Sequence, residues 1–410
     1  MAPKKDGLHF RLEYASKREH SVIGLMSGTS LDGVDAVLTR IRTSASGEVE
    51  SVQLEGHEYI PYSDKMRSIV GALCSPATAK IDDLTYIHFG LSEWYAAAVH
   101  GLLEKTGRSA GEIDLIAMHG QTVWHAPKPR DFPGPGGEPL QVKGTLQLGS
   151  PAVLHERTGI PVAADFRSAD MAAGGEGAPL APCIDGILFG SKTEGRAVQN
   201  IGGIGNVTVL PPGCPADRIF AFDTGPGNML IDAVVAAGTD GAKHYDPDGQ
   251  YGARGHADLT MVKALMSEEY FSRKPPKSTG REVYGEAFAA SFLKNCKARG
   301  LSFEDEVATA TAFTAESIAA AYRDFVIPQT PLGTAVMSGG GALNLTLMKM
   351  LAERMPGIKV VSSAELGVPV DAREAMAFAV LGHESLMDRP DNLPAVTGAR
   401  RPVVLGTITL

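Results

Sequence analysis

Three glycine-rich turns, each directly after an apolar run, constrain the fold of this chain more than any other feature. They cover residues 27–33, 200–206 and 338–341. Short apolar runs bounded by turn residues are typical of buried strands, and glycine lets backbone N–H groups approach a phosphate without a Cβ atom in the way. Any single turn has a simpler interpretation, in which glycine only supplies the positive φ of a tight hairpin. Three of them at strand ends, where open α/β sheets bind ligands, favour a phosphate site.

The elements around these turns alternate between strands and helices, which predicts an α/β fold. In both halves of the chain a strand, a glycine-rich turn, a second strand and later helices follow in that order. This repeated layout predicts two duplicated lobes. We expect an N-terminal extension over residues 1–20, lobe I over 21–190 joined by 376–410, and lobe II over 191–375.

The individual elements are predicted from apolar patterning and from turn residues. The first half is expected to contain strands at 22–26, 34–41, 51–60 and 114–118, helices at 63–73 and 81–105, and a loop rich in Pro and Gly at 125–140. The second half is expected to contain strands at 197–201, 207–210, 218–222 and 334–337, and helices at 229–237, 281–298, 304–326, 344–352 and 371–387.

The composition indicates a soluble globular protein and excludes several classes. The chain has 410 residues, of which 44% are hydrophobic and 21% charged, and its formal net charge is −9. Such a chain lacks the broad positive field that nucleic-acid partners require. The sequence contains no run of about 18 apolar residues, so no membrane span is predicted. The four cysteines lie far apart without CxxC spacing, which argues against zinc and predicts a reduced, cytoplasmic protein.

Other motifs for phosphate binding or nucleophilic catalysis are absent. The sequence has no GxxxxGK[ST] of a P-loop and no GxGxxG between a strand and a helix. Ser30 does not complete a GxSxG nucleophile elbow, because Asp32 stands where the second glycine is needed.

A set of motifs from about residue 21 onward resembles the anhydro-N-acetylmuramic acid kinase family. The motifs are IGLMSGTSLDGVD at 23–35, HGQTVWH at 119–125, DFR at 165–167, GAPL at 177–180, NIGGI at 200–204, DTGPGN at 223–228, KSTGRE at 277–282 and NLPAVTGA at 392–399. Together they cover nearly the whole chain, and their combination is specific to that family.

The resemblance implies two actin-like ATPase lobes, of the ribonuclease H-like type, around a central nucleotide cleft. It implies a transferase that uses ATP and Mg²⁺, opens a 1,6-anhydro ring with water and phosphorylates O6. The implied substrate is 1,6-anhydro-N-acetylmuramic acid, an amino sugar, and levoglucosan stays open as the substrate of related kinases. A cytoplasmic location and a homodimer are also implied. The alternative of another class is a nucleotide-dependent binding protein that transfers nothing.

The first turn offers backbone N–H groups and hydroxyls that suit a phosphate, since phosphoryl transfer depends on positioning and charge stabilisation. The resemblance makes this turn the phosphate-binding hairpin and adds residues of later loops. The predicted ATP- and phosphate-binding residues are Ser27, Gly28, Thr29, Ser30, Leu31, Asp32, Gly33, Val34, Asp35, Asn200, Gly202, Gly203, Lys277, Gly339, Gly340 and Asn344.

The resemblance implies that two carboxylates serve Mg²⁺: Asp32 as a ligand, in part through water, and Glu374 as a ligand or as part of the water network. Each has a structural alternative. Asp32 is also suited to capping its own turn, and Glu374 is spaced for a capping box with Asp371. Lys277 has the same ambiguity, because a capping box of Thr279 and Glu282 would open a helix directly after it.

Asp223 is the predicted catalytic residue. It ends an apolar strand before a Gly-Pro-Gly turn, where a carboxylate is held rigidly and partly desolvated, as a general base requires. The alternative is a helix N-cap, for which Asn228 is better spaced. In the reaction that the resemblance implies, water attacks C1 of the anhydrosugar, Asp223 takes its proton, and O6 leaves towards the γ-phosphate.

The predicted sugar contacts come from the ends of further strands. Arginine offers a rigid fork of donors and aspartate an acceptor, a combination that suits hydroxyl groups. The alternatives are a salt bridge for the Arg–Asp pair and loop bracing for the histidine cluster. The predicted substrate-binding residues are His119, Gln121, Thr122, Arg167, Asp170, Gly225 and Asn228.

Overall fold

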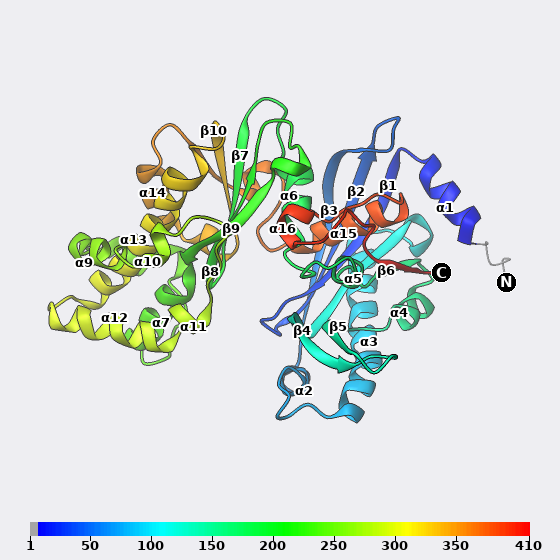
Figure 1. The fold of residues 1–410 in the computed structure, drawn as a ribbon, viewed down its shortest axis with the longest axis horizontal. Coiled ribbons are helices and arrows are strands. Elements are labelled where there is room, and N and C mark those ends of the chain that lie inside the picture. The colour runs from blue at the N-terminus through cyan, green and yellow to red at the C-terminus, as the bar shows by residue number, and fades with distance from the viewer. Residues whose placement is uncertain (1–6) are drawn as a thin grey trace. The chain divides into compact units, whose positions relative to one another are not determined.

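The computed structural model describes residues 7–410, which divide into two compact units (Figure 1). Unit 1 runs to Leu188 and resumes at Ala372, whereas unit 2 spans Phe189–Asp371. Unit 2 is therefore one continuous insertion in the chain of unit 1. None of the helices within residues 7–410 combines the length and apolar character needed to cross a lipid bilayer.

Unit 1 is built on a seven-stranded sheet with the order β12-β6-β4-β1-β2-β3, and β5 pairs with β4 outside this path. The strands are β1 (Glu19–Ser27), β2 (Gly33–Thr43), β3 (Val49–Pro61), β4 (Leu115–Pro133), β5 (Pro139–Leu148), β6 (Val162–Ala164) and β12 (Thr407–Thr409). The helices are α1 (Gly7–Ser16), α2 (Asp64–Leu73), α3 (Ile81–Thr106), α4 (Pro151–Thr158), α5 (Ser168–Ala172), α6 (Ala181–Phe189), α15 (Arg373–Leu386) and α16 (Pro394–Thr397).

Unit 2 is built on a five-stranded sheet with the order β11-β10-β7-β8-β9. The strands are β7 (Gly195–Ile201), β8 (Ile204–Leu210), β9 (Phe220–Pro226), β10 (Leu332–Ser338) and β11 (Lys359–Ser362). The helices are α7 (Asn228–Gly238), α8 (Gln250–Arg254), α9 (Leu259–Leu265), α10 (Glu269–Ser272), α11 (Arg281–Tyr284), α12 (Glu286–Ala298), α13 (Phe303–Ala321) and α14 (Leu345–Arg354).

The two sheets repeat one plan. In unit 1 the path β6-β4-β1 is parallel and β1-β2-β3 is antiparallel. In unit 2 the path β11-β10-β7 is parallel and β7-β8-β9 is antiparallel. The order and the strand directions therefore correspond position by position, which confirms the predicted pair of duplicated α/β lobes.

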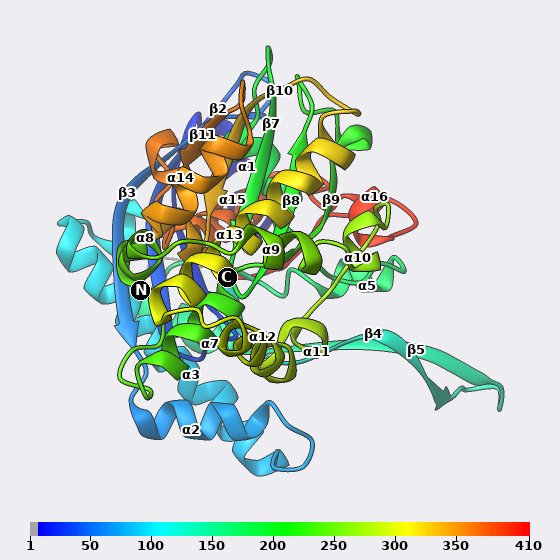
Figure 2. The same cartoon turned by 90° about the vertical axis from the view of Figure 1, so that its left-hand side faces the viewer.

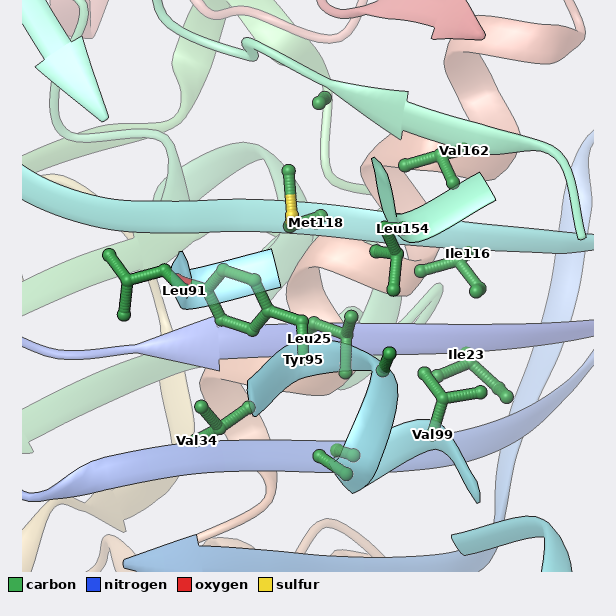
Figure 3. Packing of buried hydrophobic residues seen from close by; sticks show 14 of the residues in the cluster. Ile23, Leu25, Val34, Leu91, Tyr95, Val99, Ile116, Met118, Leu154 and Val162 are labelled. Carbon is green, nitrogen blue, oxygen red and sulfur yellow. The ribbon is translucent and has the colours of Figure 1, made fainter. Parts of the chain in front are cut away.

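The core of unit 1 follows from the alternation of side chains along β1. Ile23 and Leu25 point towards α3, where they join a buried cluster with Tyr95 (Figure 3). Val22 belongs to the cluster on the other face, which α15 covers. Gly24 lies under that helix, and a Cβ atom there would stand 1.9 Å from a backbone oxygen of α15. Glycine thus lets helix and sheet approach closely.

The predicted loop at 125–140 is wrong. These residues form the outer part of a long ribbon of β4 and β5, which runs out beyond the rest of the sheet (Figure 2). The pairing slips between Ala126 and Arg130, which places Pro127 and Pro129 in the irregular stretch. Proline lacks an N–H donor and is tolerated at such irregularities and at edges. Proline content alone therefore did not exclude a ribbon.

The predicted long helices are also divided. Residues 281–298 form α11 and α12, which are separated at Gly285, where the backbone is extended. Residues 304–326 form α13, followed by one π-helical turn over Tyr322–Val326. The apolar runs before the glycine-rich turns are strands as predicted, and α2, α3, α7 and α14 match their predicted ranges to within about two residues, the usual uncertainty of helix ends.

Candidate functional site

In unit 2, two glycine-rich turns pack against each other and against the start of α7. Gly339 has a φ of 75°, and a Cβ atom there would lie 2.6 Å from Oδ1 of Asn200. The backbone N–H of Asn228 donates to the carbonyl of Gly202 at 2.7 Å, and its Nδ2 donates to Ile201 O at 3.1 Å. The turns after β7 and β10 therefore meet the helix that follows β9.

Gly203 and Gly227 close the same contact. The backbone N–H of Gly227 donates to Gly203 O at 2.9 Å, and a Cβ atom at Gly227 would lie 2.2 Å from Gly202 O. Gly227, not Asn228, is the N-cap residue of α7, and no side chain caps that helix. The expectation that Asn228 is the N-cap is therefore wrong, and the Asn228 side chain joins two loops instead.

A cavity of about 510 Å³ opens beside these turns. Three predicted residues line it, namely Asn228, Gly340 and Asn344. Oδ1 of Asn344 also accepts a hydrogen bond from Leu347 N at 2.9 Å and so caps α14. Asn228 and Asn344 bring polar side chains to the cavity wall.

The sequence interpretation missed Asp232, whose side chain forms part of this cavity wall. Burial raises the pKa of Asp232 to about 7, and the charge of Asp246 acts in the same direction. The spacing contained a signal: Asp232 follows Asn228 by four residues on α7, and such positions share one helix face.

Asp223 lies on β9 and is held at three points. Its backbone N–H donates to Lys277 O at 3.1 Å, its carbonyl accepts from the Tyr270 hydroxyl at 2.7 Å, and its Oδ2 accepts from Thr279 N at 2.9 Å. Its Oδ1 has no hydrogen-bond partner within residues 7–410. Burial raises the pKa of Asp223, Glu282 adds to this, and the bond from Thr279 opposes it. One oxygen is fixed, and the other can accept a proton.

Lys277, a predicted ATP-binding residue, is buried in unit 2. Its side chain is only 7% exposed, and its ammonium group lies among aromatic rings and backbone carbonyls. Thr279 and Glu282 do not form the expected capping box, because α11 begins after Gly280 and no side chain caps it. Gly225, another predicted contact, has a φ of 135° and packs against Phe271.

In unit 1, the turn between β1 and β2 presents polar groups to solvent. Thr29, Ser30 and Asp32 are exposed, and Ser30 Oγ donates to Asp32 Oδ1 at 2.7 Å. Leu31 has a φ of 57°, and its N–H donates to Gly28 O at 3.3 Å. Side chains and backbone groups here remain accessible to a phosphate.

Buried residues of the predicted phosphate-binding set, together with Gln121 of the predicted substrate-binding set, support this turn. Ser27 is buried, and its hydroxyl pairs with Tyr62 at 3.1 Å. Gln121 is fully buried, and its Nε2 donates to Gly28 O at 3.0 Å. Gly33 and Val34 are buried as well. The geometry therefore gives the Gln121 side chain a bracing role for the turn.

Arg167 and His119 form one polar unit. Nε and Nη2 of Arg167 lie 3.1 Å and 2.9 Å from Nε2 of His119, and Nη1 donates to Gly177 O at 2.7 Å. Burial, followed by the charge of Arg167, lowers the pKa of His119 to about 3. A histidine this acidic is neutral near pH 7, so it accepts from Arg167 and fixes the guanidinium. Thr122 accepts from Gln147 Nε2 at 3.3 Å.

Asp170 is fully buried and surrounded by donors of unit 1. Its Oδ1 accepts from Asn392 Nδ2 and from Thr397 Oγ1, both at 2.7 Å, and its Oδ2 accepts from Gly177 N at 2.8 Å. These bonds tie the segment around Gly177 to the C-terminal part of the chain. Since Gly177 O also accepts from Arg167, Asp170 positions that arginine indirectly.

Glu374 lies in the first turn of α15, whose N-cap is Ala372 without a side-chain cap. The predicted capping box with Asp371 is therefore wrong. The carboxyl of Glu374 is accessible to solvent but crowded by protein atoms. This desolvation raises its pKa, Asp35 adds to the rise, and Arg373 and Arg167 oppose it. Asp35 itself accepts from Nε2 of His57 at 2.9 Å.

Comparison with known proteins identifies the family. The family model "Anhydro-N-acetylmuramic acid kinase" matches residues 20–410. The chain belongs to this family. It is 42% identical over 399 residues to the anhydro-N-acetylmuramic acid kinase of Caldanaerobacter subterraneus subsp. tengcongensis, an alignment that covers 97% of this chain and 99% of the relative. It is 43% identical to the enzyme of the same name from Salinibacter ruber, over 96% of this chain and 97% of the relative.

Among solved structures, component A of (R)-2-hydroxyglutaryl-CoA dehydratase from Acidaminococcus fermentans aligns over 90% of this chain and 99% of its own. The identity is 12% and the TM-score 0.43. A glucokinase of the ROK family from Streptomyces griseus, also 12% identical, has a TM-score of 0.33 over 89% of this chain and 99% of its own. Scores this low carry no argument about the site, so the family assignment rests on sequence.

Proposed function

We propose that the protein is an ATP-dependent kinase that opens the ring of 1,6-anhydro-N-acetylmuramic acid and phosphorylates its O6. Family membership over residues 20–410 supports this proposal, as do relatives of that name at more than 40% identity. The observation that carries the chemistry is Asp223, a partly desolvated carboxylate with one oxygen held by Thr279 and the other without a partner within residues 7–410.

The reaction assigns a definite task to that oxygen. A 1,6-anhydrosugar has no free 6-hydroxyl, because O6 is bonded to C1. Asp223 would take a proton from water as the water oxygen attacks C1, the C1–O6 bond would break, and O6 would form a bond to the γ-phosphorus as ADP leaves. The raised pKa of Asp223 makes it a stronger base than an ordinary aspartate, which suits proton abstraction.

We assign the remaining polar groups to the substrates. The cavity in unit 2 beside Asn228, Gly340 and Asn344 would take the nucleoside part of ATP. The turn at Gly28 and Ser30 in unit 1 would bind phosphate through its exposed donors. Arg167, fixed by His119, would orient sugar hydroxyls through its remaining donor capacity.

The donors near the first turn fit Mg²⁺. Asp32 and Glu374 both reach solvent and offer the oxygen ligands that this ion prefers. Residues 7–410 contain no cluster of three or more His, Cys, Asp or Glu side chains suited to a metal, but Mg²⁺ commonly binds one or two carboxylates together with water and substrate phosphates. The ion would neutralise charge on the phosphates. A cytoplasmic location and a homodimer remain predictions from the family resemblance.

A substrate panel tests the proposal. The protein is incubated with ATP and Mg²⁺ alone, with 1,6-anhydro-N-acetylmuramic acid, or with levoglucosan, and ADP and sugar 6-phosphate are measured. In ¹⁸O-labelled water the product sampled early is expected to carry the label in the sugar and none in the phosphate. Turnover of levoglucosan alone would reassign the substrate. ATP binding without a phosphorylated sugar would support the non-catalytic alternative.

A further inference from the structure

The side chain of Lys277 lies in a cage formed by Phe222, Tyr270, Phe271 and Phe325, which we call the Lys277 cage. The Nζ atom of Lys277 donates to the backbone carbonyls of Tyr270 and Phe271 at 3.2 Å and 3.4 Å. The same atom stands 4.7 Å from the ring centroids of Tyr270 and Phe325 and 5.9 Å from that of Phe222. Within residues 7–410 it forms no ion pair with a carboxylate.

The cage is connected to Asp223 on both sides. Tyr270, whose carbonyl accepts from the ammonium, donates its hydroxyl to Asp223 O, and Lys277 itself accepts from Asp223 N through its backbone carbonyl. Two residues later, Thr279 N donates to Asp223 Oδ2. The ammonium therefore ties together the two segments that hold the aspartate.

The strand geometry separates the ammonium from the chemistry. Phe222 and Asp223 are neighbours on β9, and successive residues of a strand point to opposite faces. The ammonium packs on the ring of Phe222, so it lies on the face away from the Asp223 carboxylate. A buried cation costs desolvation, which lowers the pKa of Lys277 to about 8. An apolar side chain would fill the cage without that desolvation cost. The charge of Lys277 therefore serves to position the two segments more than to stabilise the fold.

We propose that Lys277 is a positioning residue, whose caged ammonium holds the segments around Tyr270 and Thr279 so that the Asp223 carboxylate keeps its hydrogen bond from Thr279 N. The inference rests on the proposed function only in taking Asp223 as the base. The contacts that carry it lie wholly within unit 2.

The test follows the titration of Asp223 directly, without turnover. Protein labelled with ¹³C at aspartate Cγ is titrated by NMR, and the Asp223 signal is assigned by its absence in Asp223→Asn. In Lys277→Met we expect the midpoint to rise by about one pKa unit, because the carboxylate loses a well-aligned N–H donor. Lys277→Arg, which keeps the charge and the donors, is expected to shift much less. Lys274→Met removes an exposed lysine three residues away and should leave the midpoint unchanged.

Kinetics supply a second readout. Lys277→Met should lower kcat by about 10-fold to 100-fold, the range of a mispositioned base, with little change in KM for ATP. A folded Lys277→Met protein with the wild-type midpoint would overturn the proposal. If Lys277→Met does not fold, the Asp223 midpoint of Lys277→Gln, which keeps neutral donors, is compared with that of Lys277→Arg. Equal Asp223 midpoints in these two variants would overturn the proposal. A shifted midpoint in a protein without sugar kinase activity would uphold the positioning role and refute the proposed function.

Discussion

The backbone N–H of Thr279 donates to Oδ2 of Asp223 at 2.9 Å, although 56 residues separate the two along the chain. This bond fixes one carboxylate oxygen, and the other has no hydrogen-bond partner within residues 7–410. Because the donor is a backbone group, its position depends on how the segment that carries it is anchored. The orientation of the Asp223 carboxylate therefore depends on the segment that carries Thr279.

The first prediction concerns the base itself. Asp223→Asn keeps the size of the side chain but removes its ability to take a proton. Turnover is expected to fall by at least ~100-fold, the usual contribution of a general base, while ATP still binds. Initial rates and calorimetric ATP titrations check the two parts separately. Near-normal turnover would show that the base is elsewhere.

The second prediction is the acid limb of the pH profile. Burial raises the pKa of Asp223 above the ordinary value of 3.8, and a base is inactive when protonated. As pH falls, kcat should therefore decline through a midpoint above 3.8. The profile is measured from about pH 3 to pH 8, with circular dichroism at each pH to exclude unfolding. A limb centred at or below 3.8 would contradict this expectation.

The third prediction concerns sugar orientation. Arg167→Lys retains a positive charge but loses the fork that contacts both His119 and Gly177. We expect KM for the sugar to rise about tenfold or more, and KM for ATP to change little. Arg130→Lys is the matched control, because Arg130 is exposed on the ribbon of β4 and β5. An equal rise in KM for both substrates would argue against a specific sugar contact.

The fourth prediction concerns the packing of α15 on β1. A Cβ atom at Gly24 would lie 1.9 Å from Ala375 O, so Gly24→Ala must push the helix away. The free energy of unfolding should drop by about 1–3 kcal/mol. Gly90→Ala, in α3, meets no atom within 4 Å and should raise it by about 0.5–1 kcal/mol. Urea unfolding of both variants measures these two changes in the free energy of unfolding. If Gly24→Ala is no less stable than wild type, α15 does not pack closely on β1 at this position.

The fifth prediction concerns acid stability. Burial lowers the pKa of His383 to about 3, and Nδ1 of this residue lies 2.8 Å from the hydroxyl of Tyr14. Between the unfolded value of about 6.5 and the folded value, only the unfolded state binds the proton. His383 therefore stabilises the fold above pH 6.5, and this contribution is lost as pH falls, by about 1.4 kcal/mol per pH unit.

His383→Gln should lose stability less steeply than wild type between about pH 6.5 and pH 4.5. Glu384 has a pKa raised to about 7 by burial and slopes in the opposite sense, but it is present in both proteins. The difference between their urea midpoints thus isolates the histidine. His100→Gln, at an exposed position of α3, is the control and should follow wild type. Parallel curves for His383→Gln and wild type would refute the prediction.

The elements flanking the glycine-rich turns were predictable, because in each case an apolar strand leads directly into a glycine-rich turn. The ribbon of β4 and β5 was not, since its pairing tolerates prolines at an irregular stretch near Pro127. The capping boxes at Thr279 and Asp371 were predicted from spacing alone, but the helices begin after Gly280 and Ala372 instead. The spacing of residues in the sequence does not show at which residue a helix begins, because tertiary contacts decide where its first turn forms.

The sequence motifs supplied candidate site residues but not the contacts that these residues make. Asp223 was identified from its position after a strand, yet its partners Tyr270 and Thr279 depend on packing that no local pattern reveals. Lys277 and Asp170 are of residue types that usually reach solvent, and the structure buries both. Donors distant in sequence, Asn392 and Thr397, satisfy the Asp170 carboxylate. The Lys277 ammonium instead donates to the nearby carbonyls of Tyr270 and Phe271.

The insertion of unit 2 into unit 1 bears on how the protein folds during translation. The ribosome completes Phe189–Asp371 before it begins α15. Until that helix emerges, the face of β1 that carries Val22 and Gly24 lacks the cover of α15, and exposed apolar surface of this kind favours aggregation. The core of unit 1 can therefore be completed only after the whole of unit 2 has been synthesised.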